Sequence, residues 1–169
     1  MMIHKILILI LITLIPALEL RASIPLGILK GKLEIFNLTL QGFGLNPITV
    51  FFICVITNIF LGILVYLILN YFMHYFLQFR SFEKVYANRI EKTQRKIKPY
   101  IEKYGWFGIA LFIAIPFPGS GSYTGALAAY LLGLGYKKFI IANTIGVIIA
   151  GILVTITTLA GQGIFSLLL

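Results

Sequence analysis

Two short segments interrupt the apolar parts of this sequence, and each holds residues that could do chemistry. The first carries Glu19 and Arg21 between two prolines, Pro16 and Pro25. The arginine could neutralise an anionic headgroup inside a membrane, and the glutamate could carry a proton whose uptake and release drive a transport cycle. A Glu19–Arg21 pair that only fixes the end of a turn is the structural alternative.

The second segment is a run of prolines, glycines and serines ahead of an apolar helix. Its candidate binding residues are Pro116, Pro118, Gly119, Ser120, Gly121, Ser122 and Thr124. A helix that begins near Ser122 would present free N–H groups and the positive end of its dipole, which suit an anion such as phosphate or carboxylate. The serine and threonine hydroxyls would add donors. An ordinary turn between two membrane helices is the alternative interpretation.

The rest of the sequence offers little to an intramembrane enzyme. It contains no Asp, two His and one Cys, so no catalytic triad can be assembled and no ligand spacing suggests a metal site. A rhomboid-like protease would need Gly-x-Ser-Gly with a helical His, whereas the chain has Pro118 in place of the first glycine. We therefore predict a protein that is not an enzyme and that needs no metal or cofactor.

Composition places both segments in a membrane protein. The chain is 60% apolar and 11% charged, a balance that a soluble domain of this size could not bury in one core. The net charge of +9 invites a nucleic-acid interpretation, but eight of the 14 Lys and Arg lie between residues 80 and 103, beside long uncharged stretches. This clustering is the positive-inside pattern. We expect a multi-pass protein of the cell membrane that contacts lipids and no nucleic acid.

The first half is predicted to be a re-entrant hairpin followed by one transmembrane helix. Residues 6–29 are long enough to cross, but Pro16 should stop one helix and Pro25 should begin another. A fully spanning segment and a cleaved secretory signal are the alternatives, although Leu20 and Arg21 fit a cleavage site before Ala22 poorly. A polar loop over residues 30–46 then leads into one long helix over residues 48–79, which exceeds the bilayer core of about 30 Å.

The second half repeats this plan after a basic linker. Apolar residues recur at near-helical spacing between residues 80 and 104, which predicts an amphipathic cytoplasmic helix. Two apolar arms then flank the breaker-rich segment, and a hairpin keeps all the neighbouring lysines on one side. The last span is expected over residues 139–159. Its Asn143 loosely corresponds to Asn58 of the first spanning helix, and both asparagines suit helix packing or polar support of a site.

The predicted fold is therefore an all-α integral membrane protein made of one membrane domain over residues 1–169. Repeat one covers residues 1–79, the linker helix covers residues 80–104, and repeat two covers residues 105–169. Because each repeat crosses the membrane once, the second repeat starts from the opposite side and the two have inverted topology. The linker then lies inside, and both chain ends and the loop over residues 30–46 lie outside.

At the two interruptions the sequence resembles a known family. The segments that carry the resemblance are Glu19 to Gly27, Lys103 to Gly108 and Pro116 to Ala126. They look like the small multidrug export family, which is similar in plan to the DedA/VTT membrane transport superfamily. That resemblance implies two re-entrant hairpins in inverted repeats and a role in lipid flipping or scrambling. The chain differs from DedA-type proteins after the second loop, where Tyr123 to Gly125 replaces the usual arginine.

The resemblance also implies a central site. Its lining residues would be Glu19, Arg21, Pro25, Pro116, Pro118, Gly119 and Gly121. Together with the residue chemistry, this leads us to expect a transporter, flippase or scramblase for an anionic lipid such as a polyprenyl phosphate, with Glu19 as the candidate for proton coupling. A small multidrug exporter is the main alternative, and a membrane assembly factor without transport is the second. The sequence leaves a homodimer open.

Overall fold

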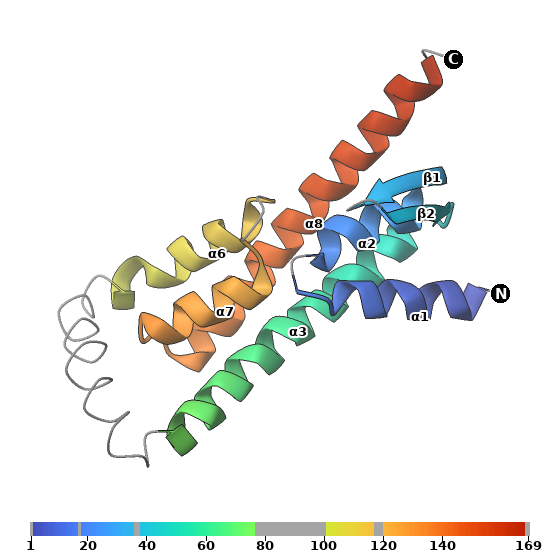
Figure 1. Cartoon of the computed structure of the whole chain (residues 1–169). Helices are drawn as coiled ribbons and strands as arrows, with labels where there is room; N and C mark the ends of the chain where they lie inside the picture. The colour runs from blue at the N-terminus through green and yellow to red at the C-terminus, as the bar shows by residue number, and fades with distance from the viewer. Residues whose placement is uncertain (1, 17, 36–37, 77–100, 117–119, 168–169) are drawn as a thin grey trace.

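The computed structural model describes residues 2–16, 18–35, 38–76, 101–116 and 120–167. Most of the predicted linker helix, and the predicted site residues Pro118 and Gly119, therefore lie outside the described residues. The described residues form two pairs of short helices, a two-stranded β-hairpin and two long helices, as Figure 1 shows. The predicted class was all-α, so the β-hairpin is an addition to it.

The first pair of helices is α1 (Met2–Thr13) and α2 (Glu19–Ile28). Pro16 lies in the turn between them, as predicted from its missing backbone N–H. The prediction that the second helix begins near Pro25 was wrong, because α2 begins at Glu19 and Pro25 lies inside it. Eight of the ten residues of α2 are buried, and this packing outweighs the one helical hydrogen bond that the proline removes.

The segment predicted as a polar loop is a β-hairpin, so that prediction was also wrong. Strand β1 (Lys30–Ile35) pairs antiparallel with β2 (Leu38–Phe43), and Lys30 lies opposite Phe43. Polar and apolar residues alternate along most of β1 and over Leu38–Gln41 of β2, and this period of two is the signal that the loop prediction overlooked. The hairpin is anchored to the helices by backbone bonds, since Gly44 N donates to the carbonyl of Leu29.

Two long helices confirm the predicted spanning segments. Helix α3 (Pro47–Phe76) and helix α8 (Tyr136–Leu167) each contain a 26-residue stretch that is long and apolar enough to cross a membrane. Helix α8 begins before and ends after the predicted span over residues 139–159. The side chains that α3 exposes are mostly large and apolar, and they include Ile48, Phe52, Ile56, Phe60, Leu64 and Ile68.

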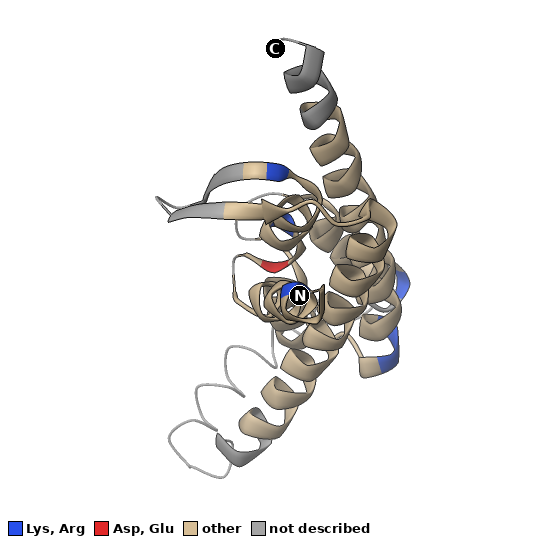
Figure 2. Ribbon diagram, turned by 90° about the vertical axis from the view of Figure 1, so that its right-hand side faces the viewer, with Lys and Arg blue, Asp and Glu red and all other residues tan. Residues whose placement is uncertain are grey.

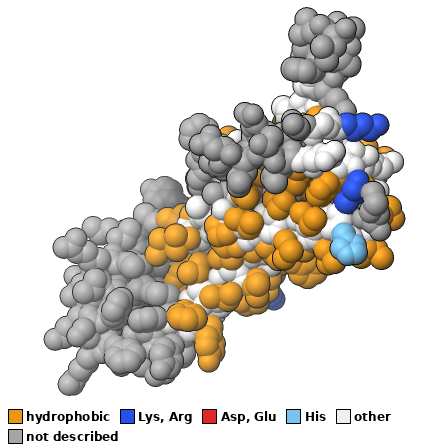
Figure 3. Space-filling model, turned by 45° about the vertical axis from the view of Figure 1, so that its right-hand side comes forward, with side chains coloured by type: hydrophobic (Ala, Val, Ile, Leu, Met, Phe, Trp, Pro, Cys, Tyr) orange, Lys and Arg blue, Asp and Glu red, His pale blue; other side chains and the backbone are white. Residues whose placement is uncertain are grey.

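The surface between the ends of the molecule is apolar. Figure 3 shows hydrophobic side chains over the middle of one face, with most of the basic side chains and the histidine of that view toward one end. Most of the described ribbon carries no charge (Figure 2). An apolar band of this kind is what lipid tails require, because a soluble surface would carry charged residues there.

The second pair of helices is α6 (Trp106–Ala114) and α7 (Ser122–Leu131). A single π-helical turn, η2 (Ile101–Gly105), leads into α6. The two predicted apolar arms around a breaker-rich centre are therefore confirmed as short helices. In Figure 1 the open ends of the two pairs lie at opposite ends of the molecule, and the starts of α2 and α7 lie near its middle.

Each helix pair packs against the long helix of the other half as well as its own. Helix α7 contacts α3, and α2 contacts α8. The shared core contains Leu9 and Ile24 from the first pair, Ile113 from the second, and Val50 and Phe139 from the long helices. The two halves therefore form one core, and the turns of both pairs are held at its centre.

Candidate functional site

Glu19 lies where the two helix pairs meet. Its side chain is only 5% exposed, although it begins a helix in a strained backbone conformation with φ of 42°. One carboxylate oxygen, Oε2, accepts a hydrogen bond from the backbone N–H of Ser122 at 3.1 Å, and Oε1 accepts one from Tyr123 N–H at 3.2 Å. The carboxylate of the first pair therefore caps the first turn of α7 in the second pair.

Asn58 brings the long helix α3 into the same site. Its Nδ2 donates to Glu19 Oε2 at 3.2 Å, and its side chain is 1% exposed. The three described donors to Glu19 are thus neutral N–H groups from α3 and α7. Hydrogen bonds to a charged acceptor are about twice as strong as neutral ones, so these donors offset part of the cost of burying a carboxylate.

Gly121 leaves the space that the Glu19 carboxylate fills. This residue precedes α7 with φ of 135°, in a region that L side chains rarely adopt. A Cβ atom at this position would lie 2.5 Å from Glu19 Oε2. Since Gly121 has no side chain to cap α7 itself, the cap comes from Glu19, which is distant in sequence.

Arg21 makes a second connection between the helix pairs. Its Nη2 donates to the Oγ of Ser120 at 2.6 Å and to the backbone carbonyl of the same residue at 2.5 Å. The Ser120 hydroxyl in turn donates to the carbonyl of Ile115 at 2.5 Å. The guanidinium is half-buried and thereby ties α2 to the turn before α7.

Two supporting contacts were not predicted from the sequence. The Tyr123 hydroxyl donates to the carbonyl of Leu14 at 2.7 Å, which joins α7 to the first turn. The Ser23 hydroxyl donates to the backbone carbonyl of Glu19 at 3.0 Å and lies 2.8 Å from Thr13 Oγ1. Ser23 follows Glu19 by four residues, a spacing that could have indicated this bond, whereas no sequence pattern indicates the Tyr123 contact.

The structure brings most of the predicted site residues together. Glu19, Arg21, Ser120, Gly121 and Ser122 form one cluster through the bonds described above. The Thr124 hydroxyl faces the carbonyl of Gly121 at 3.3 Å in the first turn of α7. Pro116 is exposed just after α6, and Pro25 lies inside α2.

Asn143 does not share a described contact with Glu19. Its Nδ2 donates to the carbonyl of Ile59 at 3.1 Å, and a Cβ atom on Gly62 would lie 2.5 Å from its Oδ1. Asn143 therefore holds α8 close to α3, which is the packing role considered for both asparagines. Of the two, only Asn58 reaches the site.

The start of α7 has the anion-binding character predicted for it, but its occupant is a side chain of the same protein. In this conformation the Glu19 carboxylate takes the two backbone N–H groups that a phosphate would use. Ser120, in the turn before α7, is likewise engaged by Arg21. The cluster is thus a set of polar contacts between the two helix pairs, placed at the centre of an apolar molecule.

Comparison with protein families identifies the chain more closely than its fold does. A family model described as "Putative small multi-drug export protein" matches residues 19–153, which include both sides of the polar cluster. The description refers to export and names no enzymatic activity. The chain has no significant match among curated proteins or among solved structures. Because the matched segment begins at Glu19 and covers most of the sequence, the chain belongs to the family of putative small multi-drug export proteins.

Proposed function

We propose that this chain is a membrane exporter of small organic cations, in which Glu19 binds in turn a proton and the exported cation. The observation that carries the proposal is a single carboxylate, 5% exposed, at the meeting point of both helix pairs and held by neutral donors. A carboxylate in a medium of low dielectric constant attracts a proton or an organic cation far more strongly than one in water. The family description supports export as the activity.

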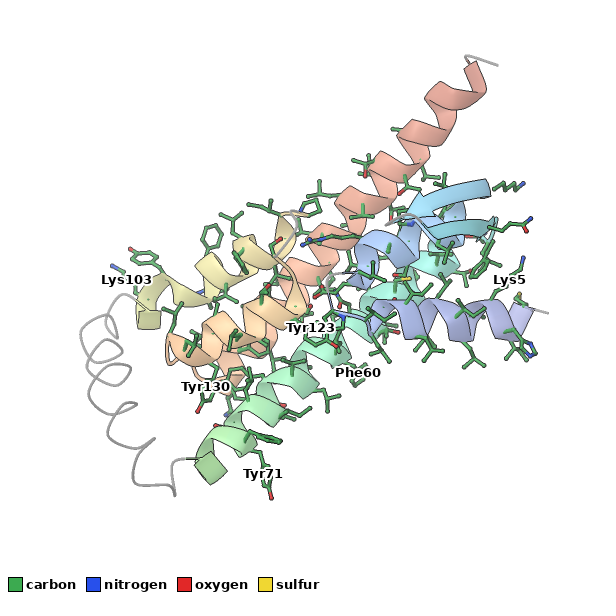
Figure 4. The ribbon with its side chains drawn as sticks, in the orientation of Figure 1. Lys5, Phe60, Tyr71, Lys103, Tyr123 and Tyr130 are labelled. Carbon is green, nitrogen blue, oxygen red and sulfur yellow. The ribbon has the colours of Figure 1, made fainter. Side chains whose placement is uncertain are left out.

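We also propose how the helix pairs lie in the bilayer. Helices of 9 to 12 residues reach only about 14 to 18 Å at roughly 1.5 Å per residue, which is too short for a hydrocarbon core of about 30 Å. Each pair therefore enters and leaves on one side as a re-entrant hairpin. Figure 4 supports opposite sides of entry, since it places Lys5 and Lys103 at opposite ends of the molecule and Tyr123 between them.

In this arrangement Glu19 lies at mid-depth and can be reached from either side in turn. A proton that enters from outside binds the carboxylate, and its release to the inside leaves the charged carboxylate free to bind a cation. The cation then leaves toward the outside. Breaking the bonds from Glu19 to α7 removes one of the connections between the two helix pairs, and the opening step that such a cycle needs also breaks those of Arg21 and Tyr123.

Transport of an anionic lipid, which we expected from the sequence, is less well supported by this geometry. A phosphate headgroup would need the N–H groups of Ser122 and Tyr123, and Glu19 already occupies them. Lipid binding would therefore require Glu19 to be protonated and displaced first. The same reconstituted system can distinguish the two substrates.

The test is uptake of a fluorescent cation such as ethidium into proteoliposomes with an imposed pH gradient. We expect transport by the native protein and its loss in Glu19→Gln, because an amide has a similar shape but cannot exchange a proton. Glu34→Gln, on strand β1, is the matched control and should transport normally. Retained transport in Glu19→Gln would overturn the mechanism. Movement of labelled polyprenyl phosphate without movement of ethidium would replace the proposed substrate with an anionic lipid.

A further inference from the structure

Two buried polar atoms beside Glu19 have no hydrogen-bond partner among the described residues. They are Oδ1 of Asn58 and Oγ of Ser122. Both belong to residues that already donate to Glu19 Oε2, through Asn58 Nδ2 and Ser122 N–H. Buried polar atoms are rarely left unpaired, because each costs about 1 to 3 kcal/mol. The site therefore holds two unpaired acceptors next to a carboxyl group whose described hydrogen bonds all come from N–H donors.

These spare acceptors matter when Glu19 takes up a proton. The charged carboxylate accepts three hydrogen bonds, from Asn58, Ser122 and Tyr123. The neutral acid carries an O–H that must donate, and its three present neighbours are all donors. Without rearrangement, the O–H would face an N–H group, so one of the two unpaired acceptors, Asn58 Oδ1 or Ser122 Oγ, must turn toward it.

We propose that Asn58 is the positioning residue that accommodates protonated Glu19, by turning its amide so that Oδ1 accepts the O–H of the acid. This inference rests on the proposed titration of Glu19. The two ends of an amide have nearly the same size, so the rotation exchanges donor and acceptor without disturbing the packing of a side chain that is 1% exposed. The movement also uses the acceptor that is unpaired in the charged state.

The proposed exchange affects the two helix pairs differently. Glu19 stays bonded to α3 in both states, through Nδ2 when it is charged and through Oδ1 when it is neutral. Its bonds to Ser122 and Tyr123 at the start of α7 weaken on protonation, because a neutral acceptor loses the charge-assisted part of each bond. Protonation therefore weakens the contact of Glu19 with the second helix pair, while the first helix pair stays attached to α3.

Other titratable groups lie on the elements that pack around Glu19. Arg21 on α2 and Tyr123 on α7 interact electrostatically with Glu19. Cys54 on α3 lies beside Ser23 and Thr13. The described titratable groups of α1 and α8 lie toward the ends of those helices that are away from the site, and they are His4, Lys5, Tyr136, Lys137 and Lys138.

Infrared difference spectroscopy of the protein in lipid, titrated without any substrate, tests the inference. The band of the protonated carboxyl C=O that is absent from Glu19→Gln belongs to Glu19. In Asn58→Leu we expect this band to move to higher wavenumber, because the O–H has lost its acceptor. Asn143→Leu is the matched control, since Asn143 is equally buried and also has an unpaired Oδ1. Its Glu19 band should stay at the native position.

Asn58→Thr provides a rescue, because a hydroxyl can either donate or accept, and its Glu19 band should return toward the native position. The native protein gives a test that does not depend on any substitution at Asn58. With isotope-labelled asparagine, acid and base spectra should differ in a side-chain amide band that persists in Asn143→Leu. An identical Glu19 band in Asn58→Leu, or no asparagine band in the difference spectrum, would overturn the inference. Because no substrate is used, failure of ethidium transport would not affect these results.

Discussion

At the scale of residues, a charge inside an apolar molecule is stabilised mainly by backbone amides. Burial of a carboxylate costs several kcal/mol, and each hydrogen bond to a charged group returns roughly 1.5 to 3 kcal/mol. Glu19 receives three such bonds, two of them at the start of a helix whose dipole also favours a negative charge. The contact with α7 therefore offsets part of the cost of burying the Glu19 carboxylate.

Gly121→Ala tests this contact at one atom. The new Cβ would lie 2.5 Å from Glu19 Oε2, at a φ of +135°, so both a steric clash and backbone strain oppose it. We expect the free energy of unfolding to fall by about 1 to 3 kcal/mol, measured as a lower thermal midpoint in detergent.

The control for this prediction is Gly108→Ala in α6. A Cβ at Gly108 meets nothing within 4 Å, and alanine favours a helix over glycine. The thermal midpoint of Gly108→Ala should therefore not decrease. Equal midpoints for the two alanine variants would show that the carboxylate is not confined at Gly121.

At the scale of elements, Tyr66 connects α3 to the turn between α7 and α8. Its ring stacks on Phe139 with centroids 4.7 Å apart, and its hydroxyl donates to the carbonyl of Leu134 at 2.6 Å. This contact fixes the far end of α7 against α3, while Glu19 holds the near end. The second helix pair is thus attached at both ends of α7, to α3 at one end and to Glu19 at the other.

Tyr66→Phe keeps the stacked ring and removes only the hydroxyl. The carbonyl of Leu134 then loses this donor in a buried position, so we expect a loss of about 1 to 3 kcal/mol in the free energy of unfolding. Tyr71→Phe is the comparison, since Tyr71 on the same helix is 75% exposed, and it should leave stability unchanged. A thermal midpoint for Tyr66→Phe equal to that of Tyr71→Phe would contradict the proposed attachment.

The elements that could be predicted from the sequence are those with local signals. Long uncharged stretches indicate α3 and α8, and Pro16 indicates the first turn because a proline acts on its own helix. Helix α2 was misplaced because its start depends on burial against other elements, which outweighs the local effect of Pro25. The β-hairpin has a local signal, and it was missed because the glycines and charges of that segment were given more weight than their alternation.

The candidate site was predictable in its members but not in its contacts. Breaker-rich segments identified Glu19, Arg21 and the residues before α7. The bond between Glu19 and Ser122 joins residues 103 positions apart, and no single-sequence pattern specifies which anion meets a helix start. The sequence also could not show that Asn58, and not Asn143, bonds to Glu19. Both are buried asparagines on long helices, and only their position relative to α2 differs.

At the scale of the whole molecule, the two hairpins and the long helices define two opposite ends. Lys5 and Lys103 mark these ends in Figure 4. If each hairpin enters from its own side, the ends face opposite compartments, and the basic linker places the Lys103 end inside.

Single introduced cysteines test this orientation. In a Cys54→Ala background, which removes the buried native thiol, Lys5→Cys should react with a membrane-impermeant maleimide added to intact cells. Lys103→Cys should react only after the cells are opened, and Lys137→Cys should behave in the same way. Reaction of Lys5→Cys and Lys103→Cys from the same side would contradict hairpins that enter from opposite faces.

The long sequence separation between Glu19 and the α7 N–H groups that it caps also determines when the two can meet during biosynthesis. A ribosome that adds 5 to 20 residues per second needs about 5 to 20 s to make the 103 residues from Leu20 to Ser122. Throughout that interval the nascent first half carries a carboxyl without its backbone donors. The polar cluster can therefore form only after the later half has been made.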